Sequence, residues 1–256
     1  MDPRGDLPPA PQRPKGDSAV PAAISSAESL ANCNFLVVGS GAAGLIGAIA
    51  ARLAGLRPVI IEKAAVWGGT TAISGGVLWI PCNDMMNDAD QADSESRARE
   101  YLHSLLGDDI NDRRAARIEA FLTAAPQMHR MLTGQGMRWY RNAGHPDYYP
   151  AQHGAAVGRI VETRIYDGRR IGDWLAKMRA NTGFTPAMHT SSGSDFILAK
   201  TSLKRLARSM GVLARHFIWR AAGRRPLTMG AGLAASLMEI VRRLEIPVLL
   251  DTKLLS

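Results

Sequence analysis

Residues 35–62 of the chain read FLVVGSGAAGLIGAIAARLAGLRPVIIE. The stretch begins with a short apolar run that ends at a glycine, which is typical of a buried strand. Residues 42–53 are rich in Ala and Leu and predict a helix, and the apolar residues 58–62 predict a second buried strand. A strand, a helix and a strand within about 30 residues form a βαβ unit with parallel strands and a right-handed crossover. The sequence therefore predicts an α/β fold with a parallel sheet.

The turn between the first strand and the helix matches G-x-G-x-x-G, the pattern of a dinucleotide-binding site. Its six residues are Gly39, Ser40, Gly41, Ala42, Ala43 and Gly44. The first glycine permits the tight turn, the second lets the backbone approach a pyrophosphate, and the third lets the helix pack on the strand. The helix N terminus adds unpaired N–H groups and a partial positive charge. A structural glycine turn in an α/β protein without a ligand is the alternative interpretation.

Glu62 ends the second strand and stands 18 residues after Gly44. This is about where a carboxylate accepts hydrogen bonds from the adenosine ribose, and its negative charge disfavours a 2′-phosphate there. The sequence at this point predicts a Rossmann-like dinucleotide domain.

The residues after Glu62 favour FAD over NAD as the dinucleotide. Positions 68–76, GGTTAISGG, contain four glycines and three hydroxyl residues, which supply hydrogen-bond donors with little bulk. Such a loop suits contact with a diphosphate and with the edge of a flavin ring, and an ordinary flexible loop is the alternative. The further candidate cofactor residues are Lys63, Gly68, Gly69, Thr70, Thr71, Ser74, Gly75 and Gly76.

Length and composition set the wider limits. With 256 residues, 46% of them hydrophobic and 21% charged, the chain can bury one core and a smaller appendage. Its two cysteines form neither a disulfide framework nor a metal-binding cluster, so we expect no metal and a cytoplasmic location. No apolar run reaches the roughly 18 residues of a membrane-spanning helix. The Pro-rich residues 1–31 lack a signal-peptide pattern, and we expect them to be a disordered leader.

The net charge of +8 is concentrated in one part of the chain, since 196–238 contains no acidic residue. Its eight cations are Lys200, Lys204, Arg205, Arg208, Arg215, Arg220, Arg224 and Arg225. They alternate with apolar residues, which predicts one or two basic amphipathic helices over 196–222. A solvated helix face is the favoured interpretation of this stretch, and peripheral contact with a membrane surface comes next. Nucleic acid is the least favoured partner, because no nucleic-acid motif accompanies the charge.

The remaining pattern is mainly helical. Residues 92–133 predict helices broken near Gly107 and Pro126, and 134–168 predict irregular structure. A short helix is expected over 171–179, a further helix over 230–244 and a last strand over 247–250.

Two segments, VVGSGAAGLIGAIAA (37–51) and VIIEKAAVWGGTTAISGGVLWIPCN (59–83), resemble the flavoprotein class that contains fumarate reductases and 3-ketosteroid dehydrogenases. The segments YLHSLLGD (101–108), PDYYP (146–150), VGRIVE (157–162) and YDGRRIG (166–172) resemble the ketosteroid dehydrogenase branch. The resemblance spans 34–256 and implies the N-terminal part of an FAD-binding domain over 32–256. It places the FAD motifs in 35–83, a helical, substrate-side segment in 92–225, and a return helix and strand in 228–256.

By this resemblance, Tyr148 lines the site of an apolar, steroid-like ketone and hydrogen-bonds the tyrosine that removes a proton next to the carbonyl. Taken alone, two tyrosines beside prolines more often anchor a loop. The partner tyrosines and the segment that closes the FAD site correspond to positions beyond Ser256 in that branch. The resemblance therefore implies a truncated chain, and we expect no turnover of a 3-ketosteroid by this chain alone. A fumarate-reductase-like site for a small dicarboxylate, and a non-catalytic membrane-surface module, are the alternatives.

Overall fold

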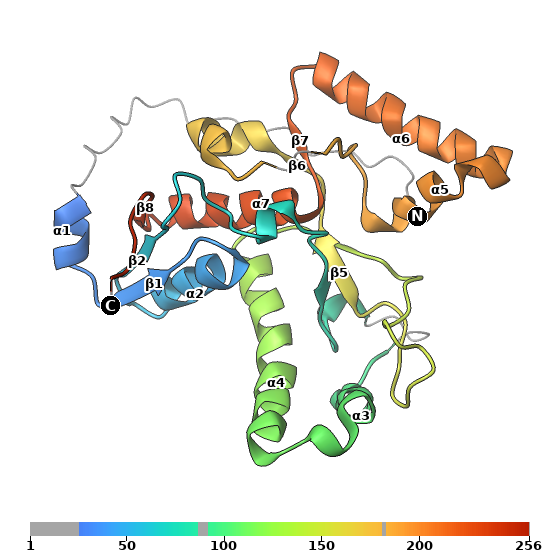
Figure 1. Cartoon of the computed structure of the whole chain (residues 1–256), viewed down its shortest axis with the longest axis horizontal. Helices are drawn as coiled ribbons and strands as arrows, with labels where there is room; N and C mark the ends of the chain where they lie inside the picture. The colour runs from blue at the N-terminus through green and yellow to red at the C-terminus, as the bar shows by residue number, and fades with distance from the viewer. Residues whose placement is uncertain (1–25, 87–91, 181–182, 256) are drawn as a thin grey trace.

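The computed structural model describes residues 26–86, 92–180 and 183–255. A parallel sheet with strand order β1-β2-β8 contains the predicted βαβ unit (Figure 1). Its elements are β1 (Phe35–Val38), α2 (Ala42–Leu53), β2 (Pro58–Ile61) and β8 (Val248–Leu249). Phe35 pairs with Pro58, and Ile60 pairs with Val248 on the other side of β2. The predicted α/β fold with a parallel sheet is confirmed.

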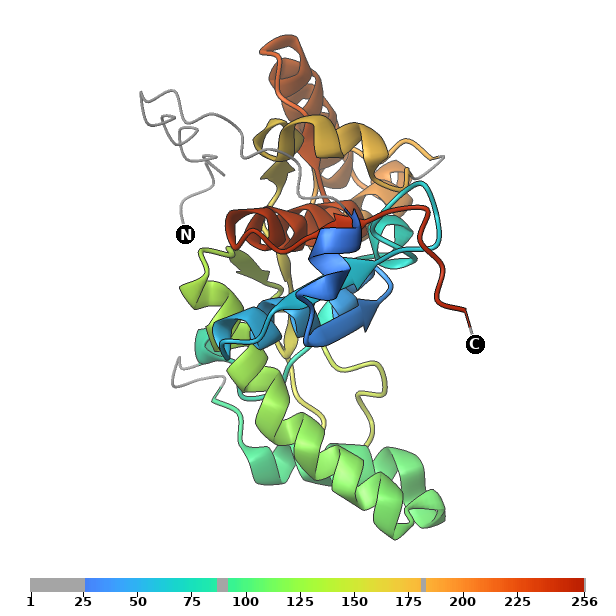
Figure 2. The same cartoon turned by 90° about the vertical axis from the view of Figure 1, so that its left-hand side faces the viewer.

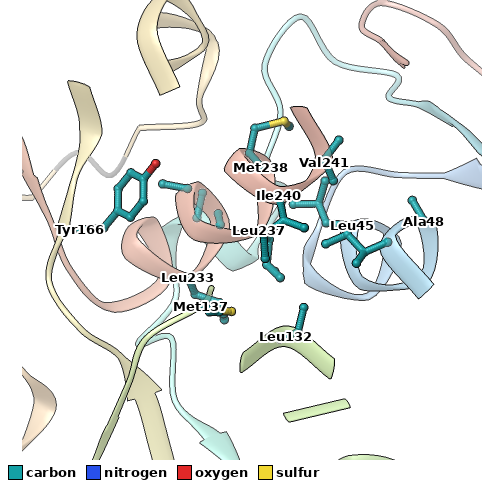
Figure 3. Close-up of a cluster of buried hydrophobic side chains, with 14 of the residues drawn as sticks. Leu45, Ala48, Leu132, Met137, Tyr166, Leu233, Leu237, Met238, Ile240 and Val241 are labelled. Carbon is teal, nitrogen blue, oxygen red and sulfur yellow. The ribbon is translucent and has the colours of Figure 1, made fainter. Parts of the chain in front are cut away.

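The main core lies between the sheet, α2 and α7 (Met229–Arg243). Figure 3 shows the side chains of these two helices meeting. Leu45 and Ala48 of α2 face Leu237 and Val241 of α7, and all four are fully buried. Because residues four apart lie on one helix face, α7 presents a continuous apolar stripe to the core. The return helix predicted over 230–244 and the last strand predicted over 247–250 correspond to α7 and β8.

The chain also forms two small antiparallel sheets, which are separate from the parallel sheet. One sheet has the order β3-β5-β4, and β6 pairs with β7. The bounds are β3 (Leu78–Trp79), β4 (Trp139–Arg141), β5 (Ile160–Thr163), β6 (Tyr166–Asp167) and β7 (Pro226–Leu227). The prediction of irregular structure over 134–168 was therefore wrong for 139–141, 160–163 and 166–167, and it is confirmed for the loop 142–159. All four β5 residues are buried, including Glu162 and Thr163, so the strand shows no alternation of apolar and polar residues.

Two helices, α3 (Glu95–Leu106) and α4 (Asp112–Gly134), extend away from the parallel sheet in both views (Figures 1 and 2). The predicted break at Gly107 is confirmed, since this residue has a φ of 51°. The predicted break at Pro126 is wrong, because α4 continues through it. Proline removes one backbone donor. Pro126 is itself buried, as are Leu122 and His129 on the same helix, and their packing holds the helix together.

The basic stretch forms α5 (Gly193–Ile197) and α6 (Leu203–Ala221), which confirms two helices there. The helix expected over 171–179 is instead 3-10 structure over Gly168–Lys177, with a kink at Gly172. Of the expected leader, 1–25 lie outside the described residues, whereas Ser26–Ala31 form the short helix α1 and so differ from the expectation. Single 3-10 turns occur at Thr71–Ile73, Asp84–Met86, Gly107–Asp109, Thr190–Ser192 and Ala199–Thr201.

Candidate functional site

The turn between β1 and α2 uses its glycines in two different ways. A Cβ on Gly44 would lie 2.0 Å from the carbonyl oxygen of Gly39, so close packing of α2 against the turn requires glycine there. Gly39 has a φ of 102°, which L-residues rarely adopt. A Cβ on Gly41 would meet only the Thr71 hydroxyl oxygen, at 3.6 Å. The folded chain therefore tolerates a side chain at Gly41, and the space beside this helix N terminus is open.

Ser40 and Glu62 connect this turn to the end of β2. The Ser40 backbone N–H and its hydroxyl both donate to Glu62 Oε2, at 3.0 and 2.6 Å. The Ala64 N–H donates to Oε1 at 3.0 Å, and Ser40 Oγ accepts from the Gly68 N–H at 3.0 Å. Ser40 is fully buried and Glu62 is 8% exposed. One serine thus joins the turn, the carboxylate and the start of the 68–76 loop.

The electrostatics of Glu62 favour its charged form. Burial alone would raise the pKa of Glu62. Hydrogen bonds from Ser40 and Ala64, together with the positive charge of Arg179, outweigh burial and lower that pKa below its ordinary value. Three hydrogen bonds leave about one of the roughly four acceptor positions of the carboxylate unused. Glu62 is therefore an anion with capacity for one further donor.

The 68–76 loop lies against the open side of the glycine turn. The Ala42 N–H at the start of α2 donates to Thr71 Oγ1 at 2.9 Å. A Cβ on Gly69 would lie 3.4 Å from the Gly41 Cα, so the two glycines face each other closely. Since Gly41 provides no side-chain cap, Thr71 takes that function from a distant part of the sequence. The structure therefore brings together the two predicted glycine segments.

The other end of the loop is packed on the N terminus of α7. The Gly230 N–H donates to the Ser74 carbonyl oxygen at 3.0 Å. A Cβ on Gly76 would lie 2.2 Å from the Met229 carbonyl carbon, and one on Gly230 would lie 1.9 Å from the Thr71 carbonyl oxygen. Gly76 and Gly230 thus permit a close backbone crossing. The sequence prediction included Gly76 but missed Gly230, because no local pattern links α7 to this loop.

The remaining predicted cofactor residues of these segments lie at the surface or beside it. Lys63, Thr70, Ser74 and Gly75 are exposed, and Ala43 lies in the first turn of α2. Gly68 is buried next to Trp67, whose indole N–H donates to the Trp174 carbonyl oxygen at 2.9 Å. Arg179 is a residue that sequence reasoning missed. Its N–H donates to the Trp67 carbonyl oxygen at 2.8 Å, which brings its charge near Glu62.

Tyr148 lies in the loop between β4 and β5. This loop, drawn in yellow-green beside β5, runs apart from the turn between β1 and α2 (Figure 1). Its side chain is 79% exposed and that of Tyr149 is 60% exposed. The preceding residue, Asp147, accepts a hydrogen bond from the Trp79 indole at 2.7 Å. Trp79 belongs to β3, the first strand after the 68–76 loop, so β3 connects the two regions.

Neither a metal cluster nor a membrane span occurs in the part of the chain that the structure describes. Among those residues no three His, Cys, Asp or Glu side chains are grouped as metal ligands would be. No described helix has both the length and the apolar character that crossing a bilayer requires.

The chain is similar to a family of FAD-binding domains and to several known dehydrogenases. The family model described as "FAD binding domain" matches residues 34–256. A 3-oxosteroid 1-dehydrogenase of Mycobacterium tuberculosis is 35% identical over 227 residues, which cover 86% of this chain and 39% of that protein. A 4-oxocyclohex-2-ene-1-carboxylate 5-dehydrogenase of Sinomonas cyclohexanicum is 30% identical over 210 residues, covering 79% and 35% of the two chains.

A solved structure agrees with these relatives. The 3-ketosteroid delta1-dehydrogenase of Sterolibacterium denitrificans, in complex with 1,4-androstadiene-3,17-dione, matches with a TM-score of 0.70 at 28% identity. The match covers 85% of this chain and 40% of that one. The chain thus spans about two fifths of the length of these relatives. With the fold, the glycine turn and the family match in agreement, the chain belongs to the FAD-binding domain family, as a relative of the 3-oxosteroid 1-dehydrogenases.

Proposed function

We propose that the chain binds FAD and serves in the dehydrogenation of a 3-ketosteroid, or a similar apolar ketone, next to its carbonyl group. The observation that carries the proposal is the network of Ser40, Glu62, Gly68 and Thr71 around the open side of Gly41. A purely structural glycine turn would have no need for open space at Gly41 or for an anionic, partly unsatisfied carboxylate beside it. Both features fit a dinucleotide.

The residues of the turn have separate tasks in this proposal. The N–H groups of Gly41, Ala43 and Gly44 at the start of α2 bind the pyrophosphate, because they have no partner within the helix. The Ala42 N–H between them donates to Thr71 Oγ1. The remaining acceptor position of Glu62 binds a ribose hydroxyl. Lys63 is exposed next to Glu62 and adds a positive charge near the phosphates.

The 68–76 loop completes the cofactor site. Gly68, Gly69 and Gly75 keep it free of bulk, and the exposed hydroxyl of Thr70 is available as a donor to the edge of the flavin. The Ser74 hydroxyl donates to the Thr71 carbonyl oxygen at 2.8 Å and accepts from the Gly76 N–H at 3.1 Å, so it holds the shape of the loop. Bound FAD would accept the two electrons that leave the ketone. In this division the FAD motifs occupy 35–83, the substrate-side segment 92–225, and the return helix and strand 228–256.

Tyr148 is the proposed substrate residue. Its ring is exposed, so it is free to pack against a polycyclic ketone and to hydrogen-bond a neighbouring acid–base group. The relatives support a ketone as the substrate class, since their names specify 3-oxosteroids and oxocyclohexene carboxylates.

A spectroscopic titration with a dehydrogenated ketosteroid, the product class of the proposed reaction, tests whether the site binds this class of ligand. FAD-loaded protein is titrated with 1,4-androstadiene-3,17-dione, and the visible flavin band is followed. We expect a saturable change of the band in the wild type and weaker binding in Tyr148→Phe, with Tyr149→Phe as the matched control. Protein that takes up FAD but shows no response to the steroid would overturn the substrate assignment and leave the FAD assignment intact.

Contact with an anionic membrane surface is a second candidate function, favoured by the exposure of α6. Leu203, Phe217 and Ile218 are 85%, 60% and 65% exposed, and α6 projects away from the parallel sheet in both views (Figures 1 and 2). Lys204 and Arg220 of the same helix are exposed and would meet anionic lipids. Arg205 and Arg208 instead lie 3.7 Å from the Asp195 carboxylate.

Co-sedimentation with anionic liposomes tests this candidate. Binding should fall as salt rises from about 0.1 M to about 1 M, where the screening length shrinks from ~10 Å to ~3 Å. It should also fall in Ile218→Ser. The control is Leu254→Ser, which removes another exposed apolar side chain far from α6 in the sequence. Equal binding by both variants would exclude α6 as the membrane contact.

A further inference from the structure

A buried charge cluster that the proposed function does not use lies between β3, α3 and β5. The Arg159 side chain is completely buried. It donates to both carboxylate oxygens of Asp93 and to Oδ2 of Asp147, each at 2.8 Å. The guanidinium carbon lies 5.5 Å from the Trp79 ring centroid and 5.7 Å from that of Tyr101. One arginine thus holds two carboxylates and lies beside two aromatic rings.

The two carboxylates hold different segments of the chain. Asp93 accepts hydrogen bonds from the backbone N–H groups of Cys82 and Ser94, so it secures the turn after β3 and the start of α3. Arg159 holds the pKa of Asp93 below its ordinary value, although burial acts in the opposite direction. Asp147 makes no hydrogen bond of this kind to the described residues of the same segment, 82–86 and 92–94. This separation makes the two residues a matched pair for mutation.

Asp147 secures the loop that carries Tyr148. Its carboxylate accepts from the Trp79 indole at 2.7 Å, from the Ala156 N–H at 3.0 Å and from Arg159. Its own N–H donates to the Ala156 carbonyl oxygen at 2.9 Å, which closes the loop from 147 to 156. Two residues after Asp147, the Tyr149 N–H donates to the Tyr101 hydroxyl at 3.2 Å.

Tyr148 is therefore held on both sides by the protein interior while its own ring lies outside. Asp147 before it is 2% exposed, whereas the Tyr148 side chain is 79% exposed. A fixed backbone with an exposed ring limits the orientations that the ring explores before it meets a ligand, and this preorganisation favours binding.

We propose that Asp147, held in place by the buried Arg159, is the positioning residue for Tyr148. The proposal rests on the proposed function in one respect, namely that Tyr148 contacts the ketone. Asp147 acts on the substrate only through the loop, and Arg159 acts only through Asp147.

The test compares Asp147→Asn with Asp93→Asn. Each variant removes one negative charge from the same arginine, so a merely structural cluster predicts similar effects from both. The first readout is hydrogen exchange of the Tyr149 and Ala156 amides, followed by NMR without any ligand. We expect exchange at least about tenfold faster in Asp147→Asn and unchanged in Asp93→Asn. The second readout is the affinity for 1,4-androstadiene-3,17-dione, which should fall only in Asp147→Asn, with FAD affinity unchanged in both.

The proposal would be overturned if hydrogen exchange of the two amides became equally faster in both variants, or if it became faster in neither. If Asp147→Asn does not fold, Trp79→Phe removes one hydrogen bond to Asp147 and keeps an aromatic ring beside Arg159, and it should show the same pattern more weakly. Wild-type protein that binds FAD but no ketosteroid would contradict the proposed function, and the amide exchange would still decide whether Asp147 orders the loop.

Discussion

Replacing Ser40 with alanine should destabilise the protein and change its response to acid. The variant loses a 2.6 Å hydrogen bond to the Glu62 carboxylate, and a hydrogen bond to a charged group contributes about 1.5–3 kcal/mol. It also leaves the buried Gly68 N–H without its acceptor, which costs about 1–3 kcal/mol. Relaxation of the loop recovers part of this sum, so we expect the free energy of unfolding to fall by about 3 kcal/mol at neutral pH.

The pH dependence follows from the pKa of Glu62. In the folded protein this pKa lies below the ordinary value of 4.5, so the stabilisation by Glu62 is fully present above pH 4.5. It is lost as the pH falls through the folded pKa, because the protonated carboxyl no longer accepts these hydrogen bonds as an anion. The difference between wild type and Ser40→Ala should therefore be largest at neutral pH and shrink below about pH 4.5.

Urea denaturation followed by tryptophan fluorescence at neutral pH and near pH 4 measures both effects. The control is Ser236→Ala, which removes a hydroxyl that donates only to the Gly232 carbonyl oxygen at 2.8 Å within α7. Its loss should not depend on pH. A Ser40→Ala difference that stays constant across this range, or one below about 0.5 kcal/mol, would refute the account of Glu62 as a stabilised anion.

The glycine turn and a buried histidine give two further expectations. Gly44→Ala should lower the unfolding free energy by about 1–3 kcal/mol, because its Cβ would overlap the Gly39 carbonyl oxygen. Gly41→Ala should change the unfolding free energy by no more than about 0.5 kcal/mol. Equal melting temperatures for the two variants would contradict this expectation. Both ring nitrogens of the buried His129 lack a hydrogen-bond partner, and burial lowers the pKa of this histidine. The folded state therefore resists protonation of His129, and the protein loses stability as the pH falls below 6.5. His129→Phe should stabilise the protein by about 1 kcal/mol at neutral pH and by more near pH 5.5, and an equal difference at the two pH values in denaturation curves would count against it.

The sequence predicted the parallel sheet and the glycine turn because their determinants are local. Gly39 and Gly44 are fixed by the backbone within a few residues, and the apolar runs of β1 and β2 lie close in the chain. The assignment of both glycine segments to one cofactor implied that they lie close together, but the hydrogen bond from Ala42 to Thr71 was not predicted.

Contacts over long sequence distances could not be predicted in this way. Gly230 meets the Thr71–Ser74 turn from more than 150 residues away, and nothing in its own neighbourhood marks it. The polar residues Glu162 and Thr163 obscure the buried strand β5 in the sequence. In the structure Glu162 can be buried because its carboxylate accepts from the N–H and the hydroxyl of Thr190. Nothing in the sequence around Arg159 marks it as buried, and only the fold brings Asp93 and Asp147 to it.

The most direct measurement is an equilibrium titration of the purified 256-residue chain with FAD, followed by quenching of flavin fluorescence. The wild type should bind one FAD per chain in a saturable manner. Gly41→Val should fold with nearly unchanged stability, since its Cβ meets only the Thr71 hydroxyl oxygen, at an ordinary contact distance of 3.6 Å. It should bind FAD at least about tenfold more weakly, a loss of about 1.4 kcal/mol or more. A wild-type chain that takes up no FAD, or a Gly41→Val variant that binds it as tightly as the wild type, would contradict the cofactor site described around Ser40 and Glu62.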